Sequence, residues 1–140
     1  MDISFIVIDD TELDQFIAKK MIQHADTSFE VKAFYEAASA LDYIKSEGEL
    51  LKDQSLTMII LDLYMPGMNG YKFLDAFEEL DPAIQDKYYI VGLTSSHEPA
   101  DLNRINSYKC AKGMLSKPLI AEDLSAIIRR MLAEKGIELQ

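Results

Sequence analysis

Acidic, hydroxyl and amino side chains follow four apolar segments of this 140-residue sequence, at the point where each segment ends. They are Asp9 and Asp10 after the first segment, Asp62, Thr94, and finally Lys117. Carboxylate oxygens are the ligands that hard divalent cations such as Mg²⁺ prefer. Carboxyl groups brought together also repel one another and lose hydration. If the fold gathers these side chains, a bound cation and the amino group of Lys117 are needed to balance their charge.

The segments that carry these residues are short and rich in Ile, Val and Leu, which predicts β-strands. The predicted strands cover residues 3–8, 29–34, 58–63, 88–93 and 113–116. The first, third and fourth are nearly continuous apolar runs, as is typical of parallel strands covered on both faces. The second alternates between apolar and polar residues, which suits an edge position.

Helical spacing separates the predicted strands. The first predicted helix follows Thr11 as N-cap and turns Leu13, Phe16, Ile17 and Met21 inward; the second turns Ala37, Leu41 and Ile44 inward. The third covers 70–80, stops at Asp81-Pro82 and buries Phe73, Leu74 and Phe77. The fourth, over 100–108, buries Leu102 and Ile105, and the fifth, over 121–134, buries Leu124, Ile127, Ile128, Met131 and Leu132. Five strands alternating with five helices predict a doubly wound α/β domain with helices on both faces of the sheet. The carboxyl ends of its strands then meet at one edge.

Composition limits the possible functions. A chain of 140 residues predicts one domain. Acidic residues outnumber basic ones by 24 to 14, for a formal charge of −10, which disfavours binding to nucleic acid or to an anionic membrane. The single cysteine, Cys110, excludes a disulfide framework and is expected to be a core or surface residue. The N-terminal apolar run is short and flanked by Asp, and there is no 18-residue apolar stretch, so we expect a soluble cytoplasmic protein.

Four segments resemble the receiver domain of two-component response regulators, of the stand-alone type similar to the chemotaxis regulator. They are Val7 to Asp10, Ile60 to Gly70, Gly92 to Ser95 and Leu115 to Leu119, and the stretch Asp62-x-x-Met65-Pro66-x-Met68-Asn69-Gly70 is the most specific. The resemblance implies a flavodoxin-like strand order 2-1-3-4-5, a receiver domain over 1–135, a short tail over 136–140 and no effector domain. Gly70 is predicted to allow a tight turn before the third helix.

The resemblance also implies a role for each strand-end residue. Asp62 is similar to the phosphoacceptor, which attacks the phosphorus of a phosphohistidine. Asp10, Asp62 and the main-chain carbonyl of Tyr64 would bind Mg²⁺ or Mn²⁺, while Asp9 would act mainly through a metal-bound water. Lys117 would neutralise charge on the transferring phosphoryl oxygens. Thr94 would form a hydrogen bond to the phosphoryl group and draw its loop inward.

Two positions depart from the pattern that receivers share. Met114 stands three residues before Lys117, where many receivers carry a Tyr or Phe ring that rotates inward when Thr94 moves. Methionine is flexible and fills similar space, but it has no ring to switch between two positions. Tyr64 replaces a small or polar residue, and its ring is expected either to shield the phosphoryl group from water or to lie over the surface.

A receiver implies protein partners. We expect a histidine kinase or a histidine phosphotransfer protein to dock beside the phosphorylation site, on Thr11, Asp14, Ile17, Pro118 and Leu119. Ile17 and Leu119 would be the apolar anchors, although Ile17 also suits the core. The signal would then leave through contacts with a downstream protein or through phosphorelay. The protein is not expected to be an enzyme, beyond self-catalysed phosphotransfer and slow autodephosphorylation.

Three other functions compete with this one. An aspartate-nucleophile hydrolase usually carries a second acid two residues after the nucleophile, where this chain has Tyr64. A flavin- or nucleotide-binding protein of the same topology needs a glycine-rich first loop, whereas Asp9-Asp10-Thr11-Glu12 would repel phosphate. A receiver-like scaffold that is not regulated by phosphorylation has the same residues, so only Mg²⁺ titration and phosphodonor labelling distinguish it.

Overall fold

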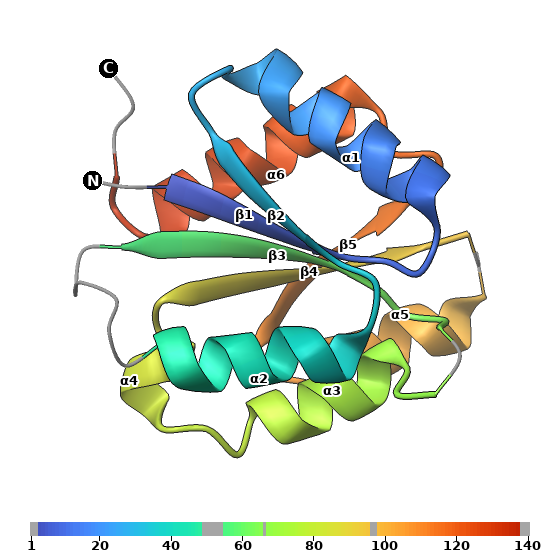
Figure 1. Cartoon of the computed structure of the whole chain (residues 1–140), viewed down its shortest axis with the longest axis vertical. Helices are drawn as coiled ribbons and strands as arrows, with labels where there is room; N and C mark the ends of the chain where they lie inside the picture. Colours follow the sequence, from blue (N-terminus) through green and yellow to red (C-terminus); the bar gives the residue numbers. More distant parts are fainter. Residues whose placement is uncertain (1–2, 49–54, 66, 96–97, 138–140) are drawn as a thin grey trace.

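The computed structural model describes residues 3–48, 55–65, 67–95 and 98–137, and within them five strands form one parallel sheet (Figure 1). The strands are β1 (Ile3–Ile8), β2 (Glu30–Phe34), β3 (Leu56–Asp62), β4 (Tyr88–Thr94) and β5 (Ala111–Ser116). Their order in the sheet is β2-β1-β3-β4-β5, and every neighbouring pair is parallel. This order confirms the predicted flavodoxin-like fold.

Helices cover both faces of the sheet (Figure 1). They are α1 (Glu12–Ala25), α2 (Ala37–Glu47), α3 (Gly70–Phe77), α4 (Pro82–Gln85), α5 (Pro99–Asn106) and α6 (Ala121–Glu134). Helices α1 and α6 lie together on one face, where they enclose one apolar core. Helices α2, α3 and α5 enclose a second core on the other face. The doubly wound arrangement predicted from the strand–helix alternation is therefore confirmed.

The burial of the strands agrees with their sequence patterns. Every residue of β3 and β4 is buried, as expected for continuous apolar strands between two helical layers. The edge strand β2 has no buried residue, as expected from its alternation. Because β1, β3 and β4 are fixed from both faces, the residues at their carboxyl ends are held on a rigid support.

The buried face of α1 differs from the predicted one. The side chains of Leu13 and Phe16 are 67% and 59% exposed, while Gln15, Ala18 and Ile22 are buried. Burial of Gln15 has a polar cause, because its amide nitrogen lies 2.9–3.1 Å from the carbonyl oxygens of Val7, Asp9 and Phe34. These contacts join α1 to the ends of β1 and β2 and rotate the apolar residues Leu13 and Phe16 towards the surface.

Further helix details differ from the predictions. In α5, Ile105 is buried as predicted, but Leu102 is exposed. The predicted helix over 70–80 ends at Phe77, and a short helix that was not predicted, α4, follows it. Asp81 caps α4 by accepting a hydrogen bond from the Ala83 N–H at 2.9 Å. The Asp-Pro pair therefore stops one helix and starts another. The buried faces predicted for α2, α3 and α6 are confirmed.

Glycine is required before α3 for a different reason than the one predicted. Gly70 does not have a positive φ; the tight turn is made by Gly67, at φ 78°. A Cβ atom on Gly70 would lie 2.7 Å from Cα of Leu63 and 2.8 Å from the Asp62 carbonyl oxygen. Gly70 thus permits close approach of α3 to the end of β3. Pro66, in the segment between β3 and α3, lies outside the described residues.

The packed part of the chain reaches beyond the predicted domain boundary at residue 135. The Ile137 N–H donates to the Leu132 carbonyl at 2.8 Å, and its side chain packs against the α1–α6 core. Residues 138–140 of the predicted tail lie outside the described residues. Cys110 is a free, buried residue. None of the described helices combines the length and apolar character needed to span a membrane.

Candidate functional site: an acidic pocket

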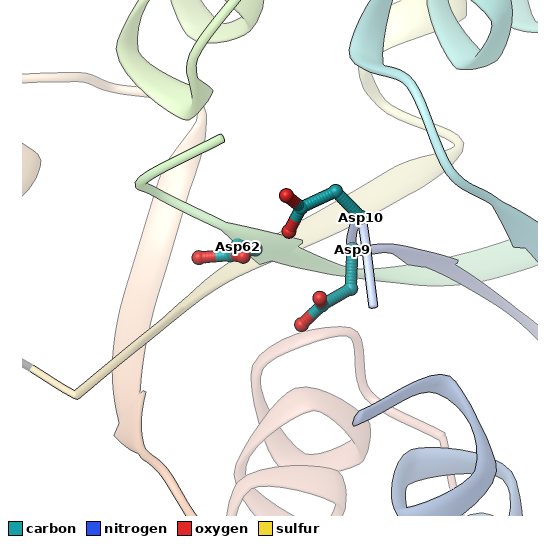
Figure 2. A group of neighbouring side chains, drawn as sticks. All are labelled: Asp9, Asp10 and Asp62. Atoms are coloured by element: carbon teal, nitrogen blue, oxygen red, sulfur yellow. The ribbon is translucent and has the colours of Figure 1, made fainter. Parts of the chain in front are cut away.

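Three carboxyl groups meet at the carboxyl edge of the sheet (Figure 2). Asp9 and Asp10 follow β1, and Asp62 is the last residue of the neighbouring strand β3. One carboxylate oxygen from each lies within 4.8 Å of the others. Asp9 is fully buried and Asp62 is 3% exposed, whereas Asp10 is exposed. The predicted convergence of the strand ends is confirmed, and these three residues form the acidic pocket.

Lys117 enters the pocket from the end of β5. Its Nζ lies 3.0 Å from Asp9 Oδ2, 3.2 Å from Asp62 Oδ2 and 2.8 Å from Asp14 Oδ2. The Lys117 backbone N–H donates to the Thr94 carbonyl at 2.9 Å, and the Lys117–Pro118 peptide bond is cis. The amino group therefore bridges the ends of β1 and β3 and helix α1. The third partner, Asp14, was predicted to face a docking protein instead.

Burial and charge shift the proton affinities in the pocket. Burial raises the pKa of the Asp62 carboxyl group, and the nearby Asp9 adds to this, while the Tyr64 N–H and Lys117 oppose it. Burial alone would lower the pKa of Lys117, but the carboxylates of Asp14, Asp9 and Asp62 outweigh it and the net pKa is raised. The hydrogen bond from Lys117 lowers the pKa of Asp14. At neutral pH the pocket therefore holds a charged amine among carboxylates.

Main-chain and hydroxyl donors orient the carboxylates. Tyr64 N–H donates to Asp62 Oδ1 at 3.1 Å. Thr11 donates to Asp9 Oδ1 through both its N–H and its hydroxyl, at 3.1 and 3.3 Å. The Thr11 hydroxyl oxygen also accepts from the Asp14 N–H at 3.3 Å, which confirms Thr11 as the N-cap of α1. One oxygen of each buried carboxylate is thus fixed by the protein, while the other faces Lys117.

The donor set of the pocket fits a hard divalent cation. Within the described part of the chain, Asp9 Oδ2 is one of two buried side-chain atoms that accept no hydrogen bond, although it forms an ion pair with Lys117. A buried carboxylate oxygen with unused lone pairs, beside oxygens of Asp10 and Asp62, suits Mg²⁺ or Mn²⁺, which bind oxygen ligands and keep several waters.

The two predicted switch residues lie on neighbouring strands. Thr94 ends β4 and is buried, and it is paired in register with Ser116 of β5. Met114 lies two residues earlier on β5, half-buried against the α2–α3–α5 core. The structure places both residues near the acidic pocket's edge of the sheet. A switching role for Thr94 and Met114 stays a prediction.

The predicted docking residues do not form one exposed surface. Thr11 and Pro118 are exposed, Asp14 is partly exposed, and Ile17 is half-buried against the α1–α6 core. Leu119 is only 5% exposed and belongs to that core, so its predicted role as a surface anchor is wrong. Leu119 lies two positions before the start of α6 and packs in the core that α1 and α6 enclose.

Sequence reasoning missed a buried acid beside the pocket. Asp101, in the first turn of α5, is 8% exposed, and its Oδ1 accepts hydrogen bonds from the hydroxyl groups of Tyr64 and Tyr71. The hydrogen bond to Asp101 raises the pKa of the Tyr64 hydroxyl group, which keeps it a donor. The Tyr64 ring is 54% exposed and reaches α5. The sequence signal was absent, because Tyr64 and Asp101 are 37 residues apart.

The fold and the pocket define a flavodoxin-like α/β domain with acidic residues and a lysine at the carboxyl edge of its sheet. The model of the response regulator receiver domain matches residues 5–129, and the chain belongs to this family. Receiver domains are signalling proteins rather than classical enzymes, interact with histidine kinases or phosphotransfer proteins, and bind Mg²⁺ at an acidic pocket.

Curated relatives and solved structures agree with this assignment. The chain is 27% identical over 126 residues to the two-component response regulator ORR1 of Oryza sativa subsp. japonica, covering 87% of this chain and 52% of the relative. It is 29% identical over 134 residues to the response regulator Rre1 of Synechocystis, covering 95% and 53%. The chain thus spans about half the length of these relatives. A response regulator receiver protein from Dyadobacter fermentans superimposes with a TM-score of 0.80 at 25% identity, over 91% of this chain and 96% of that one.

Proposed function

We propose that this protein is a response regulator whose receiver domain accepts a phosphoryl group on Asp62 from the phosphohistidine of a histidine kinase or phosphotransfer protein. One observation carries the proposal: Asp62 is a buried carboxylate at a strand end, and Lys117 Nζ lies 3.2 Å from its Oδ2. Family membership supports the assignment. Burial penalises the charge of Asp62 even with Lys117 and the Tyr64 N–H beside it, so a buried carboxylate at this position favours a functional role over a structural one.

The reaction follows from the groups around Asp62. A carboxylate oxygen of Asp62 attacks the phosphorus atom and forms a P–O bond, while the P–N bond breaks and its electron pair leaves with the imidazole. Charge on the phosphoryl oxygens must be neutralised, and Lys117 supplies an amine whose raised pKa keeps it protonated. The Tyr64 N–H, which donates to Asp62 Oδ1, orients the nucleophile.

Mg²⁺ or Mn²⁺ would be held by Asp10, Asp62 and the main-chain carbonyl of Tyr64, with Asp9 acting through a metal-bound water. When bound, the ion supplies positive charge that relieves repulsion among the carboxylates and polarises phosphoryl oxygens. Asp9 Oδ2 supports this part of the proposal, because this buried oxygen forms an ion pair with Lys117 at 3.0 Å but accepts no hydrogen bond, which leaves a lone pair for a metal-bound water. Thr11 holds the other Asp9 oxygen in place.

Phosphorylation would be passed on through the protein surface. Thr94 would form a hydrogen bond to the phosphoryl group, and Met114 would respond in the space where other receivers move a ring. The output would be a contact with a downstream protein or phosphorelay to another histidine, with slow autodephosphorylation ending the signal. A cytoplasmic location belongs to the proposal. The acidic composition disfavours nucleic acid and anionic membranes as partners.

The docking surface for the kinase or phosphotransfer helix is proposed on the start of α1 and the residue after the lysine. Thr11, Asp14 and Pro118 rim the acidic pocket. The Asp14 carboxylate is paired with Lys117 and its side chain is 28% exposed, so a partner that presents Lys or Arg would share it with Lys117. Leu13, at 67% exposure, replaces the buried Leu119 as apolar anchor in this proposal. Ile17 contributes only its exposed part.

Phosphodonor labelling tests the proposed function. Incubation with acetyl phosphate and Mg²⁺ is expected to add one phosphoryl group, detected as a mass increase, and Asp62→Asn is expected to abolish it. Asp123→Asn, an exposed carboxylate on α6, is the matched control and should be labelled like the wild type. Undiminished labelling of Asp62→Asn would refute the phosphoacceptor assignment. Absence of both Mg²⁺ binding and labelling in the wild type would favour the receiver-like scaffold.

A further inference from the structure

Asp101 is a buried carboxylate outside the acidic pocket. It lies in the first turn of α5, and its Oδ1 accepts from the Tyr71 hydroxyl at 3.0 Å and from the Tyr64 hydroxyl. Burial of an isolated carboxylate is unfavourable, and hydrogen bonds to the charged form offset that penalty. The two phenols therefore stabilise Asp101 in place, and Asp101 in turn holds both rings.

The three residues come from three different segments, which meet at Asp101. Tyr71 belongs to α3 and is held independently of Tyr64: its ring is buried, stacks on Tyr108 with centroids 6.3 Å apart, and lies 3.8 Å below the Arg104 guanidinium. The Tyr64 ring belongs to the connection between β3 and α3 and is half exposed. Asp101 and Tyr71 therefore form a support for Tyr64, whose ring meets the Tyr71 ring edge-on with centroids 6.3 Å apart and whose hydroxyl donates to Asp101.

The backbone of Tyr64 lies at the phosphorylation site. Its N–H donates to Asp62 Oδ1 at 3.1 Å, and its carbonyl belongs to the proposed metal ligands. We infer that Asp101 is a positioning residue, which by holding the Tyr64 hydroxyl fixes the Tyr64 backbone beside Asp62 and links that site to α5. This inference rests on the proposed function and deepens it, since it names how the site communicates with α5.

The link has a consequence in both directions. A phosphoryl group on Asp62 would disturb the hydrogen bond that the Tyr64 N–H donates to Asp62 Oδ1. Any resulting shift of Tyr64 would change its hydrogen bond to Asp101 on α5. By linkage, if binding at the acidic pocket changes the equilibrium constant of the Tyr64–Asp101 hydrogen bond by some factor, loss of that hydrogen bond must change the binding constant at the pocket by the same factor. The chain carries Met114 where many receivers have an aromatic ring. Tyr64 supplies an aromatic side chain that joins the acidic pocket to α5 through Asp101.

A double-mutant cycle tests this inference. Tyr64→Phe removes only the hydroxyl. Asp101→Asn replaces the charged acceptor by a neutral amide oxygen at nearly constant volume, which weakens the hydrogen bond from Tyr64. Tyr108→Phe is the matched control, since it breaks another Tyr–Asp bond, to Asp75, of 2.8 Å. The measurements are the Mg²⁺ dissociation constant by calorimetry and the rate of acetyl phosphate labelling. Each single variant should weaken Mg²⁺ binding and slow labelling by about threefold to tenfold, the range for one hydrogen bond. The double variant should be no worse than either single one, and Tyr108→Phe should match the wild type.

Hydrogen exchange of the α5 amides separates positioning from a general loss of stability. In the wild type, acetyl phosphate with Mg²⁺ should change the exchange rates of these amides. Tyr64→Phe should abolish the change, whereas Tyr108→Phe, which also loses one Tyr–Asp hydrogen bond, should keep it. Effects of Tyr64→Phe and Asp101→Asn that multiply in the double variant would overturn the inference. A Tyr64→Phe protein that binds Mg²⁺ and is labelled like the wild type would also overturn it, even if the Asp101→Asn protein does not fold. A wild type that is neither labelled nor binds Mg²⁺ overturns the proposed function itself, and the inference with it.

Discussion

Replacing Lys117 by methionine is expected to destabilise the metal-free protein and to tighten its binding of Mg²⁺. Methionine keeps most of the length of the side chain but leaves Asp9, Asp14 and Asp62 without the amine that they share. Repulsion among the carboxylates then opposes folding. The same loss of positive charge removes the competitor of the metal ion, so stability and metal affinity should change in opposite directions.

The magnitude follows from the geometry. At 2.8–3.2 Å, each contact is worth about 5 kcal/mol of Coulomb attraction at an effective dielectric constant of about 20. Most of this is offset by desolvation, and breaking a buried ion pair typically reduces the free energy of unfolding by about 3–5 kcal/mol. The Lys117 side chain retains 20% of its exposure, so solvent screening reduces the expected loss to about 2–3 kcal/mol in EDTA. Mg²⁺ at saturation should restore much of it.

Urea unfolding in EDTA and in saturating Mg²⁺ measures the effect, and calorimetry measures the metal affinity. Lys45→Met, an exposed lysine on α2, is the control and should change stability by no more than about 0.5 kcal/mol. The raised pKa of Lys117 means that the stabilisation is present below the unfolded-state pKa and is lost only as pH rises through the folded-state pKa. The difference should therefore be undiminished at neutral pH. A Lys117→Met protein as stable in EDTA as the wild type, or one that binds Mg²⁺ more weakly, would refute the reasoning.

Three further substitutions probe the pocket and its rim. Burial raises the pKa of Asp62, so the charged carboxylate is less favourable in the folded protein than in the unfolded one. Asp62→Asn should therefore raise the urea midpoint in EDTA at neutral pH. The gain should shrink as pH falls through the folded-state pKa towards the unfolded value of 3.8. Asp10→Asn should weaken Mg²⁺ binding about tenfold by calorimetry while slightly raising stability in EDTA, since it removes a like charge; lower stability there would contradict this. Leu13→Ala should slow phosphotransfer from the partner kinase about tenfold, or about 1.4 kcal/mol, yet leave acetyl phosphate labelling unchanged. Leu102→Ala, at an exposed position on α5, is the control. Equal rates of phosphotransfer to Leu13→Ala and the wild type would place docking elsewhere.

The sheet and the acidic pocket could be predicted from the sequence because each depends on a local pattern. Continuous apolar runs at Ile59 and Ile90 indicate strands buried on both faces, and both are fully buried. Once the strands are parallel, residues that directly follow them must share one edge of the sheet. Asp9, Asp62 and Lys117 therefore meet without any contact between them being visible in the sequence.

The orientation of α1 could not be predicted, because a buried polar contact outweighs its apolar pattern. Leu13 and Phe16 share the helical spacing of core residues, yet they face outward while Gln15 is buried. The determinant is a set of main-chain carbonyls that end β1 and β2, and their position is known only after the fold is. The pairing of Tyr64 with Asp101 was missed for the same reason: a hydrogen bond between distant segments leaves no periodic signal.

The position of Asp14 changes how the docking surface can be tested. Asp14 was predicted to contact a partner. Its carboxylate lies 2.8 Å from Lys117 Nζ, closer than either pocket carboxylate to which Lys117 is paired. Asp14→Lys would therefore displace the amine that the proposed phosphoryl transfer needs. A lower rate of transfer in that variant would not distinguish docking from chemistry.

The electrostatics of the pocket connect phosphorylation with cation binding. Asp9, Asp10 and Asp62 contribute acidic side chains, Asp14 adds a fourth at the rim, and Lys117 is the amine that contacts three of them. Conversion of the Asp62 carboxylate into an acyl phosphate replaces about one negative charge by nearly two. A divalent cation must then bind the phosphorylated pocket more tightly than the free one. By linkage the cation favours the phosphorylated form by the same factor, while Lys117, released from Asp62, becomes available to the phosphoryl oxygens.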